Sequence, residues 1–201
     1  MNYCSNCGST VKRRVPPGDD RPRYVCDNCH RVYYDNPKVV VGCIPEWEGR
    51  ILLCRRAIEP RKGFWTVPAG FLEIGETLSE GAERETLEEA NARVEILAPF
   101  TLLDITHAGQ AYLIFRGRLL DTDFTPGDES LEVDLFSEDE IPWSEIAFTS
   151  IIASLRFYFK DRRTGNFSFH TGRILPDRQN PSDPFREILE ESREFSCSWG
   201  K

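Results

Sequence analysis

The sequence predicts an α+β protein in which a small cysteine-rich module precedes a larger sheet-based domain. Three observations predict this class. Two Cys-x2-Cys pairs lie near the amino terminus, apolar runs of strand length follow, and two later segments repeat their apolar residues at helical spacing. With 201 residues, 40% of them hydrophobic, the chain can fill one large core beside the module. We place a module at residues 1–36, a main domain at 37–161 and a carboxy-terminal extension at 162–201.

The first module carries four patterned cysteines. Cys4 and Cys7 form one pair, and Cys26 and Cys29 form another at the distance typical of a zinc ribbon. Four thiolates complete a tetrahedral site, so a structural Zn²⁺ is predicted in preference to a catalytic or redox role. His30 could replace one thiolate. A module of this size buries too little apolar surface to fold alone, so its metal contributes to its folding.

The remaining cysteines and the composition bear on location. Seven cysteines is an odd number, which fits a reducing compartment better than a disulfide framework. Cys43 and Cys54 lie in apolar runs and are predicted to be buried, whereas Cys197 follows no pattern. Neither a signal peptide nor a membrane span is indicated. We therefore expect an intracellular, cytoplasmic protein with no membrane partner.

The net charge of −8 argues against a general nucleic-acid-binding surface, which is basic in most proteins that have one. An anionic substrate would have to be attracted locally, by metal ions and a few arginines. Arg55 and Arg56, together with Arg61 and Lys62, concentrate positive charge in one such place. They either contact a phosphate or the surroundings of a metal ion, or are solvated loop residues, and we predict substrate contact for Arg55 and Arg56.

The main domain begins with two predicted strands. Residues 38–44 are continuously apolar, which is typical of a strand buried on both faces. Residues 47–49 form a hairpin turn, and residues 50–56 form the return strand. Two alternating segments, 93–105 and 110–119, are predicted to join the same sheet. Phe64 and Trp65, which follow the first pair, are predicted to pack rather than to stack on a base.

The second half mixes both periodicities. A strand is predicted at residues 131–136 and a second large helix at 148–160. Residues 165–170 alternate like a strand, and residues 176–184 are expected to be an extended link. Residues 185–195 are predicted to form a short amphipathic helix, with Ser182 or Asp183 near its start. This helix could dock on the same chain or on a partner subunit.

A first helix is predicted from the chemistry of its ends. Thr77 and Glu80 form a capping box, and Asn91 is suited to a left-handed stop just past the last turn. Gly81 costs about 1 kcal/mol in a helix interior, so a neighbouring backbone is expected to approach closely there.

Three glutamates share one face of this helix. Glu85, Glu88 and Glu89 stand at positions i, i+3 and i+4, where like charges repel by roughly 0.2–0.5 kcal/mol per pair. Their oxygens suit hard divalent ions such as Mg²⁺ or Mn²⁺. The alternative is a solvated acidic face.

The segment at residues 70–92 resembles the Nudix box, Gly-x5-Glu-x7-Arg-Glu-U-x-Glu-Glu-x-Gly-U, in which U is a bulky apolar residue. The departures are Thr86 and Ala92 at the U positions and Asn91 in place of the last glycine. None of them removes a carboxylate. The fixed positions that match are Gly70, Glu76, Arg84, Glu85, Glu88 and Glu89.

The resemblance implies an α/β/α sandwich with a mixed central sheet, and an enzyme that cleaves the diphosphate of a nucleoside diphosphate linked to a second group. It implies that Mg²⁺ is held at Gly70, Glu76, Glu85, Glu88 and Glu89, that a metal-activated water attacks, and that Glu88, Glu89 and Arg84 are catalytic. Arg84 would orient a ligand glutamate by ion pairing rather than touch substrate.

A further glutamate is expected from a later loop or strand, because related Nudix enzymes often use one as a metal ligand or general base. Glu132 is preferred for its distance to Phe136, and Glu129 is the competing residue. Tyr112, in the segment GQAYLIF, is predicted to bind substrate.

Two Nudix groups with zinc ribbons are similar to this sequence. The bacterial NADH pyrophosphatases and NAD-RNA decapping enzymes carry the signature SQPWPFP after the box, which this chain lacks. The plant chloroplast FAD and ADP-ribose pyrophosphatases and their bacterial relatives are similar over more segments, including YYDNPKVVVGC, GFWTVPAG and FSFHTGRI. FAD or ADP-ribose is therefore the predicted substrate, with NADH or NAD-capped RNA as the alternative.

A different class of function is also open, in which the Nudix fold is a non-catalytic binding or regulatory module and the ribbon docks a partner or nucleic acid. Intact carboxylates and the acidic charge favour the enzyme. By analogy with ADP-ribose-type Nudix enzymes, we expect a homodimer.

Overall fold

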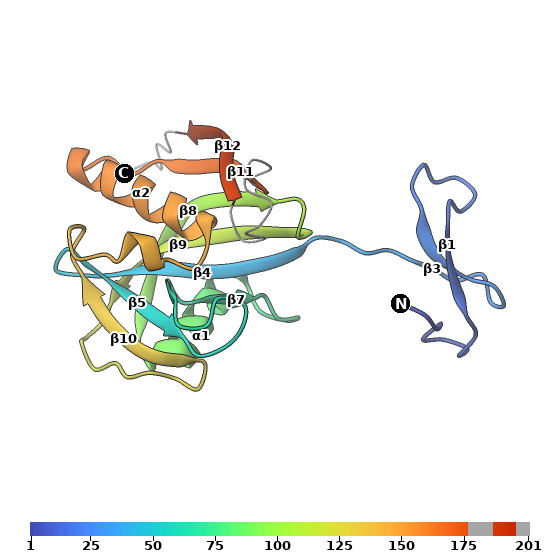
Figure 1. Cartoon of the computed structure of the whole chain (residues 1–201), viewed down its shortest axis with the longest axis horizontal. Helices are drawn as coiled ribbons and strands as arrows, with labels where there is room; N and C mark the ends of the chain where they lie inside the picture. Colours follow the sequence, from blue (N-terminus) through green and yellow to red (C-terminus); the bar gives the residue numbers. More distant parts are fainter. Residues whose placement is uncertain (177–186, 196–201) are drawn as a thin grey trace. The chain divides into compact units, whose positions relative to one another are not determined.

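The computed structural model describes residues 1–176 and 187–195, which divide into a unit of Met1–Pro37 and a unit that begins at Lys38 (Figure 1). The break falls next to the boundary predicted at residue 36. The first unit is a small antiparallel sheet in the order β1-β2-β3. Its strands are β1 (Val11–Arg14), β2 (Arg23–Cys26) and β3 (Val32–Tyr33).

The second unit is built on a mixed sheet, which has nine strands among the residues described. The order along the sheet is β10-β5-β4-β9-β8-β11-β12, with β6 beside β5 and β7 beside β4. The pairs β4–β9 and β8–β11 are parallel and the others antiparallel. The strands are β4 (Lys38–Trp47), β5 (Arg50–Arg56), β6 (Trp65–Thr66), β7 (Ala69–Phe71), β8 (Val94–Ile105), β9 (Gln110–Leu119), β10 (Ser130–Phe136), β11 (Phe169–Pro176) and β12 (Glu187–Phe195).

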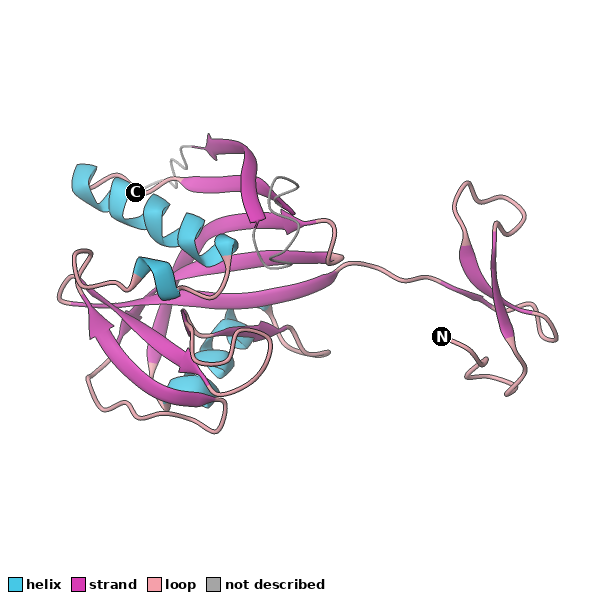
Figure 2. Cartoon of the chain, in the orientation of Figure 1, coloured by secondary structure: helices cyan, strands magenta, loops and turns pink. Residues whose placement is uncertain are grey.

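Two helices, α1 (Leu78–Ala90) and α2 (Thr149–Thr164), cover opposite faces of this sheet, and a 3-10 turn (Trp143–Glu145) precedes α2 (Figure 2). Successive side chains of a strand point to opposite faces. Ile51 and Leu53 of β5 therefore pack with Leu155 of α2, whereas Leu52 and Cys54 pack with Ala90 of α1. The predicted α/β/α sandwich with a mixed sheet is confirmed, and burial on both faces explains the continuous apolar runs.

Most element boundaries agree with the sequence. The predicted turn is present, with Glu48 and Gly49 both at positive φ between paired Trp47 and Arg50. The strand predicted at 38–44 continues to Trp47. Cys43 and Cys54 are buried, as predicted.

The carboxy-terminal prediction was wrong in two respects. The strand predicted at 165–170 occurs later, as β11 (Phe169–Pro176). The segment predicted as a short amphipathic helix at 185–195 contains β12, which runs antiparallel to β11 with Leu189 opposite Ile174. Because β11 extends the sheet from β8, its outer edge has backbone groups that another strand can satisfy, and this pairing outweighs the helical spacing. Ser182, Asp183, Cys197 and the link beyond Pro176 lie outside the described residues.

No helix in the part of the chain that the structure describes is both long and apolar enough to cross a membrane.

Candidate active site and metal centres

The four predicted zinc ligands meet in the first unit. The Sγ atoms of Cys4, Cys7, Cys26 and Cys29 all lie within 4.8 Å of one another. A tetrahedral Zn²⁺ with Zn–S bonds of about 2.3 Å needs sulfur atoms about 3.8 Å apart, and the Cys4–Cys29 and Cys7–Cys26 distances are 3.6 and 3.5 Å. The donor set therefore fits zinc.

The knuckle geometry has a local cause. Gly8 and His30, each directly after a Cys-x2-Cys pair, have φ of 72° and 59°, in the left-handed region. This conformation reverses the chain behind each cysteine pair. The cluster of possible ligands found among the described residues contains the four cysteines and does not include His30.

Helix α1 begins and ends as predicted. Glu80 N donates to Thr77 Oγ1 at 3.3 Å, and Thr77 N donates to Glu80 Oε2 at 2.7 Å, which completes the capping box. Asn91 has φ of 48°, and its N–H donates to the Leu87 carbonyl at 2.8 Å. A Cβ at Gly81 would lie 2.8 Å from Val41 Cγ2, so the predicted close approach is real but comes from a side chain of β4.

Arg84 holds three carboxylates of the Nudix segment. Its Nε and Nη2 donate to the two oxygens of Glu76 at 2.9 and 2.8 Å, and Nη1 donates to Glu85 at 2.7 Å and Glu88 at 3.1 Å. Nη2 also donates to the Phe71 carbonyl at 3.1 Å. This geometry fits the predicted orienting role.

Glu76, predicted as a magnesium ligand, is occupied by hydrogen bonds. Both of its oxygens accept from Arg84, and Oε1 also accepts from Glu73 N at 2.6 Å. These bonds, the Arg84 bond first, lower the pKa of Glu76 to about 2. Its side chain is not part of the pocket wall, so we assign it to positioning Arg84.

Gly70 has a steric role. A Cβ there would lie 2.3 Å from the carboxylate oxygens of Glu85. Any side chain at position 70 would displace the Glu85 carboxylate from its place in the pocket wall.

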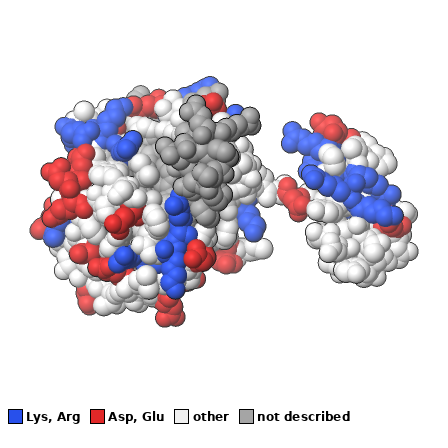
Figure 3. Space-filling model, viewed as in Figure 1, with Lys and Arg blue, Asp and Glu red and all other residues white. Residues whose placement is uncertain are grey.

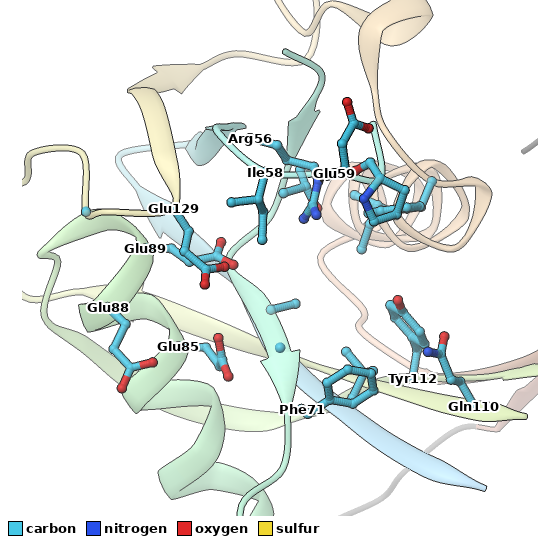
Figure 4. A pocket seen from close by; sticks show the side chains of 18 of the residues that line it. Arg56, Ile58, Glu59, Phe71, Glu85, Glu88, Glu89, Gln110, Tyr112 and Glu129 are labelled. Atoms are coloured by element: carbon cyan, nitrogen blue, oxygen red, sulfur yellow. Dashed lines mark hydrogen bonds between the residues drawn. The ribbon is translucent and has the colours of Figure 1, made fainter. Parts of the chain in front are cut away.

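Four carboxylates gather at one end of a pocket of about 1100 Å³: those of Glu85, Glu88, Glu89 and Glu129 (Figure 4). Glu85 and Glu89 are each only 8% exposed. Burial, then the charge of Glu85, raises the pKa of Glu89 to about 8, and Arg56 opposes the shift only in part. Burial also raises the pKa of Glu85. Buried carboxylates that raise one another's pKa are a donor set that a divalent cation would satisfy.

The structure brings Glu129, and not Glu132, to these carboxylates. The loop before β10 docks on the end of α1, where Gly127 N donates to the Glu89 carbonyl at 3.0 Å and Asn91 Nδ2 donates to the Pro126 carbonyl at 3.2 Å. Glu132 lies on β10 opposite Arg55. Its Oε2 accepts from Arg55 Nη1 at 3.3 Å, outside the pocket wall. The earlier preference for Glu132 therefore finds no support in the geometry.

Arg55 and Arg56 separate because neighbouring residues of a strand face opposite ways. Arg55 donates to the Gly63 carbonyl at 2.9 Å and pairs with Glu132, so it is not placed to contact a phosphate. Arg56 lines the pocket, with its guanidinium carbon 5.2 Å from the centre of the Phe148 ring. Of the two predicted arginines, only Arg56 lies at the site.

The predicted packing role of Trp65 is confirmed, since its ring meets Phe136 edge-on at 4.9 Å within the core.

Phe71, Gln110 and Tyr112 line the pocket away from Glu85 and Glu88 (Figure 4). His107, in the turn that joins Ile105 to Gln110, and Glu187, 2.9 Å from His107, also line the pocket. Tyr112 was predicted to bind substrate, and the other four were not predicted. Val40 on β4 is opposite both Phe71 and Tyr112, so these rings belong to one row across three strands. The register between strands brings them together, and the sequence carries no signal of that register.

Basic side chains gather on the ribbon (Figure 3). Lys12, Arg13 and Arg14 of β1 are all exposed, and Lys12 Nζ lies 2.9 Å from Asp27 Oδ2. Residues 1–37 contain six Lys and Arg against four Asp, so the net charge of −8 belongs to the second unit rather than to the ribbon.

The sequence matches the NUDIX domain over residues 36–155 and the Nudix N-terminal zinc ribbon over residues 2–35. The chain therefore belongs to the NUDIX domain family. A NUDIX hydrolase of known structure from Nitrosomonas europaea is 56% identical, with a TM-score of 0.84 over 86% of this chain and 98% of its own. An ADP-ribose pyrophosphatase from Streptococcus suis, 22% identical over 69% of this chain and 98% of its own, shares the fold with a TM-score of 0.54.

Two curated relatives carry more specific names. The NAD-capped RNA hydrolase NudC of Photorhabdus laumondii is 36% identical over 97 residues, which are 47% of this chain and 35% of the relative. The ADP-ribose pyrophosphatase of Methanocaldococcus jannaschii is 30% identical over 113 residues, 54% of this chain and 67% of the relative. This chain thus matches about a third of the length of the NudC relative. The comparisons confirm the predicted family, fold and ribbon.

Proposed function

We propose that this protein hydrolyses the diphosphate of a nucleoside diphosphate linked to a second group, with the help of a divalent metal ion. One observation carries the proposal: the carboxylates of Glu85, Glu88, Glu89 and Glu129 converge at one end of a pocket that Arg56 also lines. A solvated acidic face would not bury Glu85 and Glu89 to 8% exposure.

Mg²⁺ or Mn²⁺ fits this donor set, because both ions prefer carboxylate oxygens and bind substrate phosphates at the same time. Glu85, Glu88 and Glu89 would hold the ion. When bound, it supplies positive charge at the phosphate oxygens and makes a coordinated water more acidic. Zn²⁺ is proposed for the four cysteines of the ribbon, where it stabilises the fold.

Four further residues have separate proposed roles. Arg84 fixes Glu85 and Glu88 in position, and Gly70 leaves room for the Glu85 carboxylate. Glu129, carried by a loop that is hydrogen-bonded to the end of α1, would accept the proton of the attacking water. Arg56 lines the same pocket and would bind a phosphate oxygen. Its positive charge would balance the negative charge of the phosphate.

The proposed substrate is ADP-ribose or FAD. The relative named ADP-ribose pyrophosphatase supports this choice, and the pocket of about 1100 Å³ is large enough for a dinucleotide-sized ligand. A second candidate, NADH or NAD-capped RNA, is favoured by the similarity to NudC. A homodimer remains our expectation.

A substrate panel tests the proposal. The full chain, with Mg²⁺ or Mn²⁺, is incubated with FAD, ADP-ribose, NADH, NAD and NAD-capped RNA, and the products are identified. We expect two monophosphate products from at least one of them. Glu89→Gln should lower kcat by about 100-fold or more, because a buried ligand carboxylate is lost.

Glu83→Gln is the matched control, since Glu83 lies on the same helix but is exposed. It should retain wild-type turnover. The proposal fails if the panel shows no turnover with either ion, or if Glu89→Gln is as active as Glu83→Gln.

A further inference from the structure

Strand β12 adds a carboxylate to the pocket from outside the family domain. The NUDIX match ends at residue 155, whereas Glu187, the first residue of β12, lines the pocket. Its side chain is 13% exposed. The acidic end of the pocket, formed by Glu85, Glu88, Glu89 and Glu129, lies within the NUDIX match. Glu187 lies outside that match.

The position of Glu187 is fixed from two sides. It stands opposite Pro176 in the antiparallel pair of β11 and β12. Its carbonyl accepts from Thr149 Oγ1 at 3.4 Å, at the start of α2, and further along β12 Glu194 pairs with Lys160 of α2 at 2.8 Å. Contacts with both the sheet and the helix make Glu187 a defined part of the wall.

The Glu187 carboxylate has an imidazole as its neighbour. Its Oε1 lies 2.9 Å from Nε2 of His107, in the turn between β8 and β9. Burial raises the pKa of Glu187, and His107, then Arg61, oppose that rise. A carboxylate has about four acceptor positions, so pairing with one imidazole leaves capacity for donors from a ligand.

Aromatic rings flank this carboxylate's end of the pocket. Phe71, 46% exposed, and Tyr112 lie together with Gln110 on the side away from Glu85 and Glu88 (Figure 4). Lys38 Nζ lies 5.0 Å from the centre of the Phe71 ring, so this aromatic face already attracts a polar group. Flat apolar faces beside hydrogen-bonding groups are suited to a base with its sugar.

We propose that this end of the pocket is a nucleoside subsite, in which Glu187 accepts hydrogen bonds from ribose hydroxyls and excludes a phosphate on that ribose. The proposal rests on the proposed function for the placement of the diphosphate at the other end. Glu187 thereby determines specificity: it favours nucleotides with a free ribose diol over those with a 2′-phosphate, through attraction to donors and repulsion of a like charge.

Binding of two nucleotides tests the subsite without any turnover. AMP and adenosine 2′,5′-bisphosphate differ by the ribose phosphate, and neither contains the diphosphate to be cleaved. Titration calorimetry on the full chain with Mg²⁺ should show AMP binding roughly tenfold tighter. In Glu187→Gln the ratio of the two dissociation constants should fall close to one. The amide does not repel a phosphate, and it accepts hydrogen bonds from ribose hydroxyls less strongly than a carboxylate.

Two control variants separate charge from structure. Glu190→Gln removes the same charge from an exposed position of β12 and should keep the wild-type preference. His107→Gln removes the imidazole beside Glu187 but leaves the carboxylate, so the ratio of the two dissociation constants should stay in favour of AMP or increase. An equal loss of preference in His107→Gln and Glu187→Gln would mean that the pair acts only by holding β12, and would overturn the proposal.

Failure of this inference is distinguishable from failure of the proposed function. An unchanged preference in Glu187→Gln, or no AMP binding by an enzyme that hydrolyses ADP-ribose, refutes the subsite and leaves the activity standing. Discrimination between the two nucleotides without hydrolysis of any diphosphate refutes the activity and leaves the subsite standing.

Discussion

The two ends of the pocket are built in different ways. The acidic end comes from one continuous segment, residues 70–92, with Glu129 added by a loop that is hydrogen-bonded to the end of that segment. The nucleoside end takes one or two residues each from β7, β9, the turn after β8, and β12. One is a local motif, and the other is a product of sheet topology.

Chemistry and substrate choice depend on different ends of the pocket. The acidic end has a fixed geometry because Arg84 joins Glu76, Glu85 and Glu88 within one helix and its preceding loop. The nucleoside end depends on strand register and on β12, which lies outside the family match. We infer that chemistry is set at the first end and substrate choice at the second.

The largest expected effect separates two glutamates of one segment. Glu129→Gln should lower kcat by about 100-fold or more, because a general base or a metal ligand is lost at the acidic end. Glu132→Gln, which changes the same charge at a site paired with Arg55, should stay within about twofold of wild type. Steady-state kinetics with the best substrate of the panel measures kcat for both variants. A larger loss of kcat in Glu132→Gln than in Glu129→Gln would show that Glu132 acts in the active site.

A smaller loss is expected from Gly70→Ala. The new Cβ would meet the Glu85 carboxylate at 2.3 Å, and that flexible carboxylate can move aside, so the fold should survive. A displacement on the order of 1 Å at a reacting centre costs up to about 100-fold in rate. We expect kcat to fall by tens of fold with only a small change in Tm. Gly109→Ala is a control in open space, although its positive φ adds some strain. A Gly70→Ala enzyme with wild-type kcat would show that Glu85 does not need its present position.

Phe71→Leu probes the nucleoside end and should act on KM rather than kcat. Loss of about 1 kcal/mol of packing on a base corresponds to about a fivefold rise in KM. Phe195→Leu is the matched control, because Phe195 is exposed to a similar extent, 48% against 46% for Phe71, but does not line the pocket. A fall in kcat with KM unchanged would contradict the division of roles between the two ends.

The sequence predicted the parts of the molecule that are local. The capping box, the left-handed Asn91, the four cysteines and the carboxylate face each depend on residues a few positions apart, so their spacing alone specifies the geometry. The same holds for Arg84, whose partners lie one turn away or in the preceding loop.

The structure departs from the sequence-based expectations where distant segments meet. Glu129 and Glu132 differ by three positions, and only the docking of the loop on α1 selects one of them. Arg55 and Arg56 could be told apart only once the face of β5 that lines the pocket was known. The segment of β12 has helical spacing, but pairing with β11 decides its structure. His107 and Glu187 lie on different elements, and no short-range pattern joins them.

The smallest effect concerns stability at the acidic end. The pKa of Glu89 is about 8 in the folded protein, against 4.5 for an ordinary glutamate, so the folded state retains a proton that the unfolded state has lost. Without metal, stability should be full below that ordinary pKa and fall as pH rises through about 8. Because Mg²⁺ binds the charged carboxylates, the rise in Tm that it causes should be larger near pH 8 than near pH 6, on the order of a few °C.

Tryptophan fluorescence can follow this change in the second unit alone, because Trp47, Trp65, Trp143 and Trp199 all lie after residue 37. Glu89→Gln should flatten the pH dependence and reduce the Mg²⁺ effect, since the buried charge is gone. Glu187→Gln should leave the Mg²⁺ effect intact, because His107 already faces that carboxylate. A rise in Tm with Mg²⁺ that is equal at both pH values would mean that the ion does not bind at the buried glutamates. If Glu89→Gln and Glu187→Gln reduced that rise equally, the two ends of the pocket would not be independent.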